Sequence, residues 1–96
     1  MTIRAATALA AFRKPFVVAL ARELTRSRER RGLQQGELAR KLAFSQPQLC
    51  RYEAAQNEPS ITTFVAWCEA LELEPHDVLR AVQKRAAAYA AMGDAP

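Results

Sequence analysis

The segment GELARKLAFSQPQLCRYE, residues 36–53, holds two short helical patterns of opposite character. Its first half spaces apolar residues along one helical face, which predicts a short helix packed against a core. In its second half Leu49 and Tyr52 share an apolar face, and we expect Cys50 to bury as a small hydrophobe. The second helix therefore presents polar side chains for which the chain itself offers no obvious partner.

Ser45 is the predicted start of this second helix. Its hydroxyl suits an N-cap, and Pro47 falls in the first turn, where its missing N–H does least harm. Gln48, three residues after Ser45, is either held in a capping box or free to face outward. With Leu49 and Tyr52 turned inward, the residues predicted to face outward are Gln46, Pro47, Gln48 and Arg51.

The segment before this pair, residues 16–31, predicts a helix that ends at Gly32. Its apolar stripe comprises Val17, Leu20, Ala21 and Leu24, and one further step of four reaches Arg28. Either the helix has left the core at that point, or Arg28 is buried against a carboxylate, because a buried unpaired charge is costly.

Two more helices are predicted after the central segment. Ser60 caps residues 61–71, and Pro75 opens a last helix that extends to about Tyr89. No strand pattern competes, so we predict an all-helical protein. Half of its 96 residues are hydrophobic, which suits one small core, and no apolar run approaches the roughly 20 residues that a membrane span needs.

The first residues form a separate pattern. Residues 1–14 are basic and free of acids, with apolar residues at helical spacing, and Pro15 is expected to interrupt them. The composition resembles an organellar transit peptide, but the pattern equally suits an extra helix or a basic arm, which we favour.

The charge is distributed unevenly. Residues 1–51 hold eleven Lys and Arg against three acids, whereas residues 52–96 hold three against seven. This polarity suits a polyanionic partner on one side, although a solvated surface of uneven charge is an equal alternative.

The cysteines limit the kinds of site. Cys50 and Cys68 stand with a single histidine, His76, and form neither a zinc motif nor a disulfide framework. We therefore expect a reducing cytoplasm, no metal, no cofactor and no membrane. An enzyme is a poor interpretation because no group is placed to orient a nucleophile.

A packed helix followed by an outward-facing one is the arrangement of a helix-turn-helix. The chain resembles the phage-repressor and Cro type of this family, in residues that occur in the family's order and spacing. They are Gly32-Leu33, Gln35, Glu37-Leu38-Ala39, Leu42, Ser45, Arg51, Glu53, Pro59-Ser60, Leu71 and Leu79.

The resemblance implies an all-α, five-helix, lambda-repressor-like domain with an additional N-terminal helix or arm. We divide the chain into a basic N-terminal extension (1–15), the helix-turn-helix domain (16–82) and a C-terminal helical extension and tail (83–96).

The resemblance also implies residue roles. Gln35 would donate to a DNA phosphate, Ser45 would cap the recognition helix and reach a phosphate, and Arg28 would form a structural ion pair with Glu53. The positions that face base edges would be Gln46, Pro47, Gln48 and Arg51.

The chain departs from the family pattern at four positions. Gln34 replaces the usual cap and Gly36 a helix former, while Ala43 and Ala55 stand where glycine is usual. Alanine is strained at those last two positions if they require positive φ.

The expected function is sequence-specific binding of double-stranded DNA by a transcriptional regulator, most simply a homodimeric repressor on a near-palindrome. The alternative is an antitoxin-like interaction module that neutralises a protein partner and binds DNA for autoregulation. Such a partner, or an antiactivator, would dock on the N-terminal extension.

Overall fold

The computed structural model describes the backbone of residues 3–92 and the side chains from Ala8 to Met92. Five helices follow one another without a strand among the described residues: α1 (Ile3–Arg30), α2 (Gln35–Lys41), α3 (Gln46–Glu53), α4 (Ile61–Ala70) and α5 (Pro75–Ala91). The prediction of an all-helical, five-helix domain is confirmed. None of these helices is long and apolar enough to cross a membrane.

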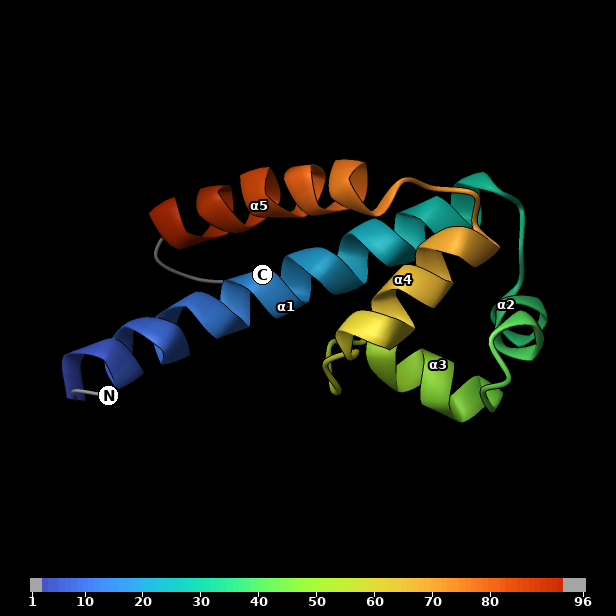
Figure 1. The fold of residues 1–96 in the computed structure, drawn as a ribbon, viewed down its shortest axis with the longest axis horizontal. Coiled ribbons are helices and arrows are strands. Elements are labelled where there is room, and N and C mark those ends of the chain that lie inside the picture. Colours follow the sequence, from blue (N-terminus) through green and yellow to red (C-terminus); the bar gives the residue numbers. More distant parts are fainter. Residues whose placement is uncertain (1–2, 93–96) are drawn as a thin grey trace.

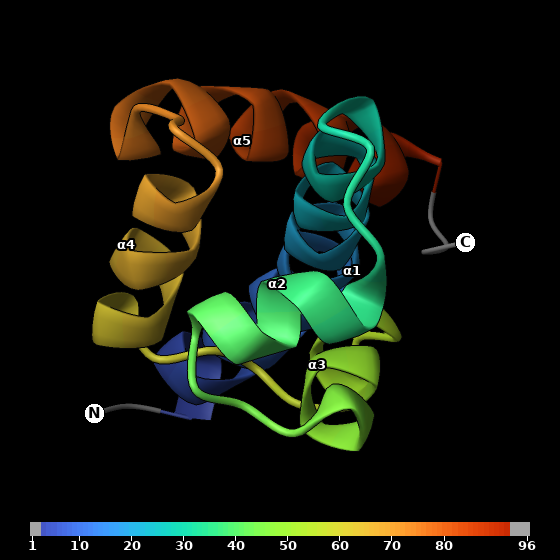
Figure 2. The same ribbon diagram turned by 90° about the vertical axis from the view of Figure 1, so that its right-hand side faces the viewer.

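The long α1 is the support for the rest of the molecule. α5 lies alongside it, while α2, α3 and α4 gather around its C-terminal half (Figure 1, Figure 2). Every helix supplies side chains to one core, whose largest fully buried members are Trp67, Leu24, Leu38, Leu49, Leu71, Val82 and Cys68. α2 buries Leu38 in this core and α3 buries Leu49, so the opposite face of each helix is turned toward solvent.

The prediction that Pro15 interrupts the helix is wrong. The predicted extra N-terminal helix is present, but it is continuous with the next one and forms the first half of α1. α1 continues through Pro15, although proline removes one backbone hydrogen bond and crowds the carbonyl four residues earlier. Phe16 and Val18 pack against the core directly after the proline, and the Phe12 and Phe16 rings stack across it with centroids 5.3 Å apart. The extension is therefore the first half of α1, and its residues Ala8–Lys14 are exposed.

Three helices end in the same backbone conformation. The residues that close α2, α3 and α4 have positive φ: Ala43 (56°), Ala55 (61°) and Glu72 (57°). In each case the next amide donates back over the end of the helix, which satisfies a terminal carbonyl. These bonds run from Phe44 to Ala39 (2.8 Å), from Gln56 to Arg51 (2.9 Å) and from Leu73 to Cys68 (2.8 Å).

Two of these positions are the alanines that replace the family's glycines. Ala43 and Ala55 lie in the left-handed region, where a side chain other than glycine's costs about 1–2 kcal/mol. Gly32 closes α1 in the same region, with φ 70°, at no such cost. The turn between α2 and α3 is therefore held under strain by the packing on either side.

Candidate nucleic-acid interface

α2 and α3 cross at one end of the molecule and form the predicted two-helix unit (Figure 2). α2 buries Leu38 and Ala39, and α3 buries Leu49, with Tyr52 half-buried beside it. Tyr52 meets Phe44 of the turn and Trp67 of the core, at ring-centroid distances of 5.6 and 6.1 Å. Aromatic packing thus fixes α3 from behind.

The start of α3 is capped as the sequence predicts. The Ser45 hydroxyl accepts a hydrogen bond from the backbone amide of Gln48 at 3.2 Å, and Pro47 lies in the first turn. The Gln48 side chain makes no return bond to Ser45 among the described residues, so the reciprocal capping box is incomplete. Gln48 is half-buried on the flank of α3, whereas Gln46, Pro47 and Arg51 are fully outward.

The expectation that Cys50 is buried is wrong: its side chain is exposed. Cys50 follows Gln46 by four residues and Pro47 by three, so all three lie on the same helical face. The spacing alone could have placed Cys50 outward, but its apolar character suggested the core. The outward face of α3 therefore consists of Gln46, Pro47, Cys50 and Arg51, which we call the reading face.

Arg28 reaches Glu53 and forms a two-point ion pair. Arg28 Nε lies 2.8 Å from Glu53 Oε2, and Arg28 Nη2 donates to Glu53 Oε1 at 3.1 Å. The side chains are 11% and 4% exposed, so water screens the pair little. The hydrogen bond to Glu53 raises the pKa of Arg28, although burial opposes the shift.

The remaining hydrogen-bonding capacity of the pair is used by its neighbours. Arg28 Nη1 donates to the backbone carbonyl of Leu33 at 2.6 Å, which ties the end of α1 to the loop before α2. Gln35 Nε2 donates to Glu53 Oε1 at 2.9 Å, which ties the start of α2 to the end of α3. The ion pair therefore joins three helices at one point.

A further hydrogen bond extends this network to the reading face. Gln46 Nε2 donates to Gln35 Oε1 at 2.8 Å. The Gln35 amide thus lies between Glu53 and Gln46, half-buried, and one hydrogen of its Nε2 remains for another acceptor. Gln46, on the surface, is thus linked through Gln35 to the buried Arg28–Glu53 ion pair.

Exposed cations surround this end of the molecule. Arg40 and Lys41 lie exposed in the last turn of α2, and Arg51 lies exposed in the last turn of α3. None of the three forms an ion pair with another described residue. Arg51 provides unneutralised positive charge on the reading face itself, whereas Lys41 lines a hollow with Glu69 and Glu72 beside α4.

Comparisons with known proteins agree with this geometry. Residues 19–83 match the family model described as a helix-turn-helix domain, which confirms the resemblance inferred from the sequence. Two solved structures of the clp gene regulator ClgR from Corynebacterium glutamicum are similar to the chain. One is 28% identical over 81% of this chain and 83% of its own, with a TM-score of 0.75. The other is 27% identical over 73% and 90%, with a TM-score of 0.69. No significant match was found among curated proteins.

Proposed function

The chain belongs to the helix-turn-helix domain family, and from that premise we propose that it is a repressor that binds a near-palindromic operator as a homodimer. The family match and the two regulator structures support a DNA-binding transcriptional regulator. The finer proposal rests on the reading face, which is packed from behind and exposed in front. Among the described residues, the one hydrogen bond made by its side chains is that from Gln46 to Gln35.

The network behind Gln46 carries the proposal. Because one Nε2 hydrogen of Gln46 is used by Gln35, the other hydrogen and Oε1 remain at the outer edge of the amide. A glutamine in this state matches the N7 acceptor and N6 donor of adenine. An exposed amide that is already held in one direction loses less conformational freedom when it binds a base edge, which favours base readout.

The other members of the reading face have complementary chemistry. Arg51 has the donors for guanine O6 and N7, the commonest specific contact to DNA. Pro47 and Cys50 offer small, weakly polar surfaces that suit a thymine methyl group. Gln48 lies on the flank of α3 and reaches a base only at the edge of the contact.

Phosphate contacts would position this face. Gln35 keeps one amide hydrogen for a phosphate, and the exposed Ser45 hydroxyl lies at the start of α3. Arg40 and Lys41 would add attraction that does not depend on sequence. Such contacts fix the register of the helix but carry no base preference.

Selection of bound duplexes from a random DNA library tests the proposal. A homodimer is expected to enrich two inverted half-sites whose centres lie one helical turn, roughly 34 Å, apart. Sedimentation of the free protein and of the complex gives the number of chains. No enriched sequence would contradict sequence-specific binding, and a single half-site bound by one chain would contradict the dimer.

A second candidate function, the antitoxin-like module, is favoured by one observation. The first half of α1 lies away from α2 and α3 (Figure 1). It exposes Phe12 and Leu9, and Phe12 lines an apolar groove. The reading face does not include this surface, which either a second copy of the chain or a protein partner would cover. If the module is correct, adding the protein partner changes the affinity for the operator, whereas a simple repressor responds only to its own concentration.

A further inference from the structure

The first half of α1 carries two adjacent cations, Arg13 and Lys14, that the interface formed by α2 and α3 does not include. Residues 1–14 hold no acidic residue. The side chains of Arg13 and Lys14 are exposed, and Lys14 forms no ion pair among the described residues. Arg13 lies 3.9 Å from Glu58 of the loop after α3, but both members of this pair are more than half exposed, so its net energy is small. The two cations therefore keep their charge available for another molecule.

Lys14 lies on the side of α1 that faces α3. Lys14, Ala21 and Arg28 follow one another at intervals of seven residues, close to two helical turns, so they leave α1 on one side. Ala21 lines a hollow beside Glu53 at the end of α3, and Arg28 pairs with the same carboxylate. α1 therefore extends past the end of α3 and presents a cation toward the side that α3 occupies.

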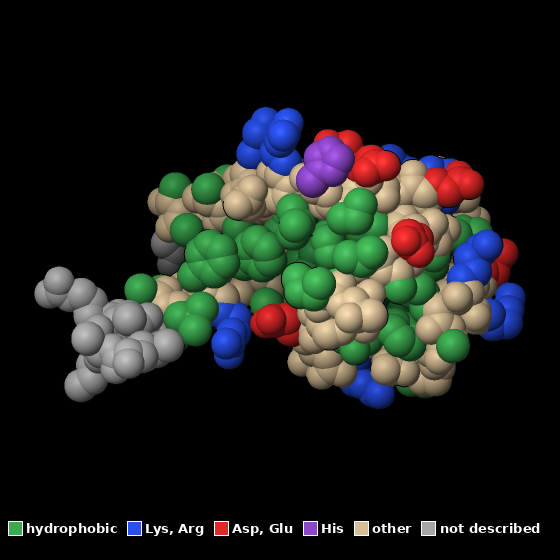
Figure 3. All heavy atoms as spheres, in the orientation of Figure 1, with side chains coloured by type: hydrophobic (Ala, Val, Ile, Leu, Met, Phe, Trp, Pro, Cys, Tyr) green, Lys and Arg blue, Asp and Glu red, His purple; other side chains and the backbone are tan. Residues whose placement is uncertain are grey.

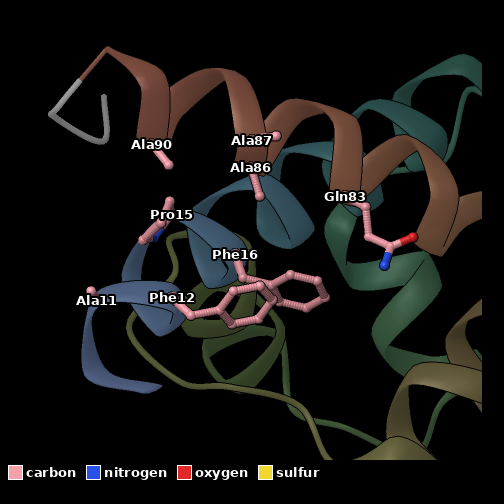
Figure 4. A pocket seen from close by; sticks show the side chains of 8 residues that line it. All are labelled: Ala11, Phe12, Pro15, Phe16, Gln83, Ala86, Ala87 and Ala90. Atoms are coloured by element: carbon pink, nitrogen blue, oxygen red, sulfur yellow. The ribbon is translucent and has the colours of Figure 1, made fainter. Parts of the chain in front are cut away.

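The aromatic side chains of the same stretch lie on another side of α1. Phe12 and Phe16 line a groove together with Gln83 of α5 (Figure 4). α5 and α3 lie on opposite sides of α1 in both ribbon views (Figure 1, Figure 2). The groove and the cations therefore belong to different sides of the same stretch of helix.

The reading face lies on the same side of the molecule as the two cations. It is the side of α3 turned away from the buried Leu49, and α3 lies below α1 in both ribbon views, with α5 above (Figure 1, Figure 2). The first half of α1 descends to the level of α3 in the same views. On the face drawn in Figure 3, most acidic side chains lie over α4 and α5, and Lys or Arg side chains protrude from the lower edge. A rod-shaped polyanion that meets the reading face and runs along α1 would also meet the two cations.

The separation of the cations from α3 suits the DNA beside the bases that the reading face contacts. Lys14 precedes Arg28 by 14 residues, which is about 21 Å along α1. At about 3.4 Å for each base pair, this distance is about six base pairs from the point where α3 meets α1. Because Lys and Arg are common ligands of DNA phosphates, we propose that Arg13 and Lys14 bind the DNA backbone about six base pairs from the bases that α3 reads. These contacts rest on the proposed function and add a second point of attachment to DNA.

The salt dependence of operator binding counts these contacts. Arg13→Gln combined with Lys14→Gln is compared with wild type by fluorescence anisotropy on the selected operator. Each lost phosphate contact lowers the slope of log affinity against log salt by about 0.9, so wild type should lose at least about tenfold more affinity than the variant between about 50 and 200 mM salt. The base preference should not change, because phosphate contacts carry no sequence information.

Arg80→Gln combined with Lys84→Gln is the matched control, since it removes the same charge from α5. Both side chains are exposed, and neither pairs with an acid among the described residues. This variant should follow wild type across the salt range, because charges more than about 10 Å from the DNA are largely screened. Thermal melts should show both variants as stable as wild type, since the replaced side chains are exposed.

Neutral phosphates locate the contact on DNA. Single methylphosphonates are placed at each backbone position of the operator in turn, one position in each duplex. Wild type should lose affinity at positions about six base pairs to one side of the base pair that Arg51 reads. The Arg13→Gln, Lys14→Gln variant should bind those duplexes and the unmodified operator equally, because it has no contact there to lose.

The outcomes distinguish these contacts from the proposed function. A wild-type chain that selects no operator refutes the proposed function, and the phosphate contacts with it. A wild type that reads its operator with the same salt slope as Arg13→Gln, Lys14→Gln refutes the phosphate contacts alone, and so do methylphosphonates that weaken both proteins alike. An equal loss in Arg80→Gln, Lys84→Gln would show that net charge sets the affinity, whatever its position. An acidic protein that binds wild type but not the Arg13→Gln, Lys14→Gln variant, with DNA affinity unchanged, would assign the two cations to a protein partner.

Discussion

Replacement of Glu53 by alanine is expected to destabilise the fold by about 3–5 kcal/mol, because it leaves the Arg28 guanidinium buried without its counter-ion. With the carboxylate gone, Arg28 keeps only the Leu33 carbonyl at 2.6 Å, and Gln35 loses its acceptor at 2.9 Å. The 11% exposure of the Arg28 side chain gives water little access to replace them.

Thermal unfolding followed by circular dichroism measures this loss. At about 4–8 °C per kcal/mol for a domain of this size, the Tm of Glu53→Ala should fall by at least about 12 °C. Glu53→Gln keeps the shape and one acceptor, so its loss should be smaller. Glu58→Ala is the control: its 3.9 Å pair with Arg13 is more than half exposed, and its removal should cost no more than about 0.5 kcal/mol.

The same variants report on the hydrogen-bond network. In Glu53→Gln the one remaining oxygen is expected to accept from Arg28, so Gln35 loses its acceptor and holds Gln46 less firmly. Assayed at a temperature where it is folded, this variant should bind the operator more weakly. A Glu53→Ala protein that melts within about 2 °C of wild type would refute the reasoning. It would mean that Arg28 reaches solvent and that the ion pair does not brace α3.

Four further outcomes are expected. Ala43→Gly and Ala55→Gly should each raise stability by about 1 kcal/mol in thermal melts, because both positions have positive φ; a lower Tm would mean that the turns are unstrained. Gly36→Ala should add about 0.5–1 kcal/mol, since the new Cβ meets only Arg40 Nη1 at 3.8 Å. If operator affinity nevertheless falls, the lack of a side chain at Gly36 is what lets DNA come close to α2. Near neutral pH a maleimide should modify the exposed Cys50 and spare Cys68, whose pKa burial raises to about 11, and the label should abolish operator binding. Full binding by the labelled protein would place Cys50 outside the interface.

The helices and the Arg28–Glu53 contact could be expected from the sequence for a physical reason. Apolar periodicity is a local property, and a charge on an apolar stripe requires a partner wherever the fold brings one. Arg28 lies on the apolar stripe of the helix that precedes the two-helix unit, and the family resemblance implied Glu53 as the carboxylate that pairs with it. The caps at Ser45 and Ser60 depend on neighbours three residues away, so they too could be inferred.

Features that depend on tertiary packing could not be inferred. Pro15 is a helix breaker by its local chemistry, yet α1 continues through it, with Phe16 and Val18 packed on the core beyond it. Cys50 has an apolar side chain at an outward position, so composition and spacing gave opposite answers. The hydrogen bond between Gln35 and Gln46 joins residues eleven positions apart, and no sequence pattern marks it.

The most direct measurement is the base discrimination of Arg51→Ala on the selected operator. Affinities of wild type and variant are determined for the operator and for each single base-pair change, at two salt concentrations. Arg51→Ala should lose about 1–3 kcal/mol on the operator and lose its preference at one base pair of each half-site. Arg40→Ala, the control, should weaken all duplexes alike and reduce the salt dependence. Full affinity and unchanged base preference in Arg51→Ala would contradict the reading of DNA by the outward face of α3.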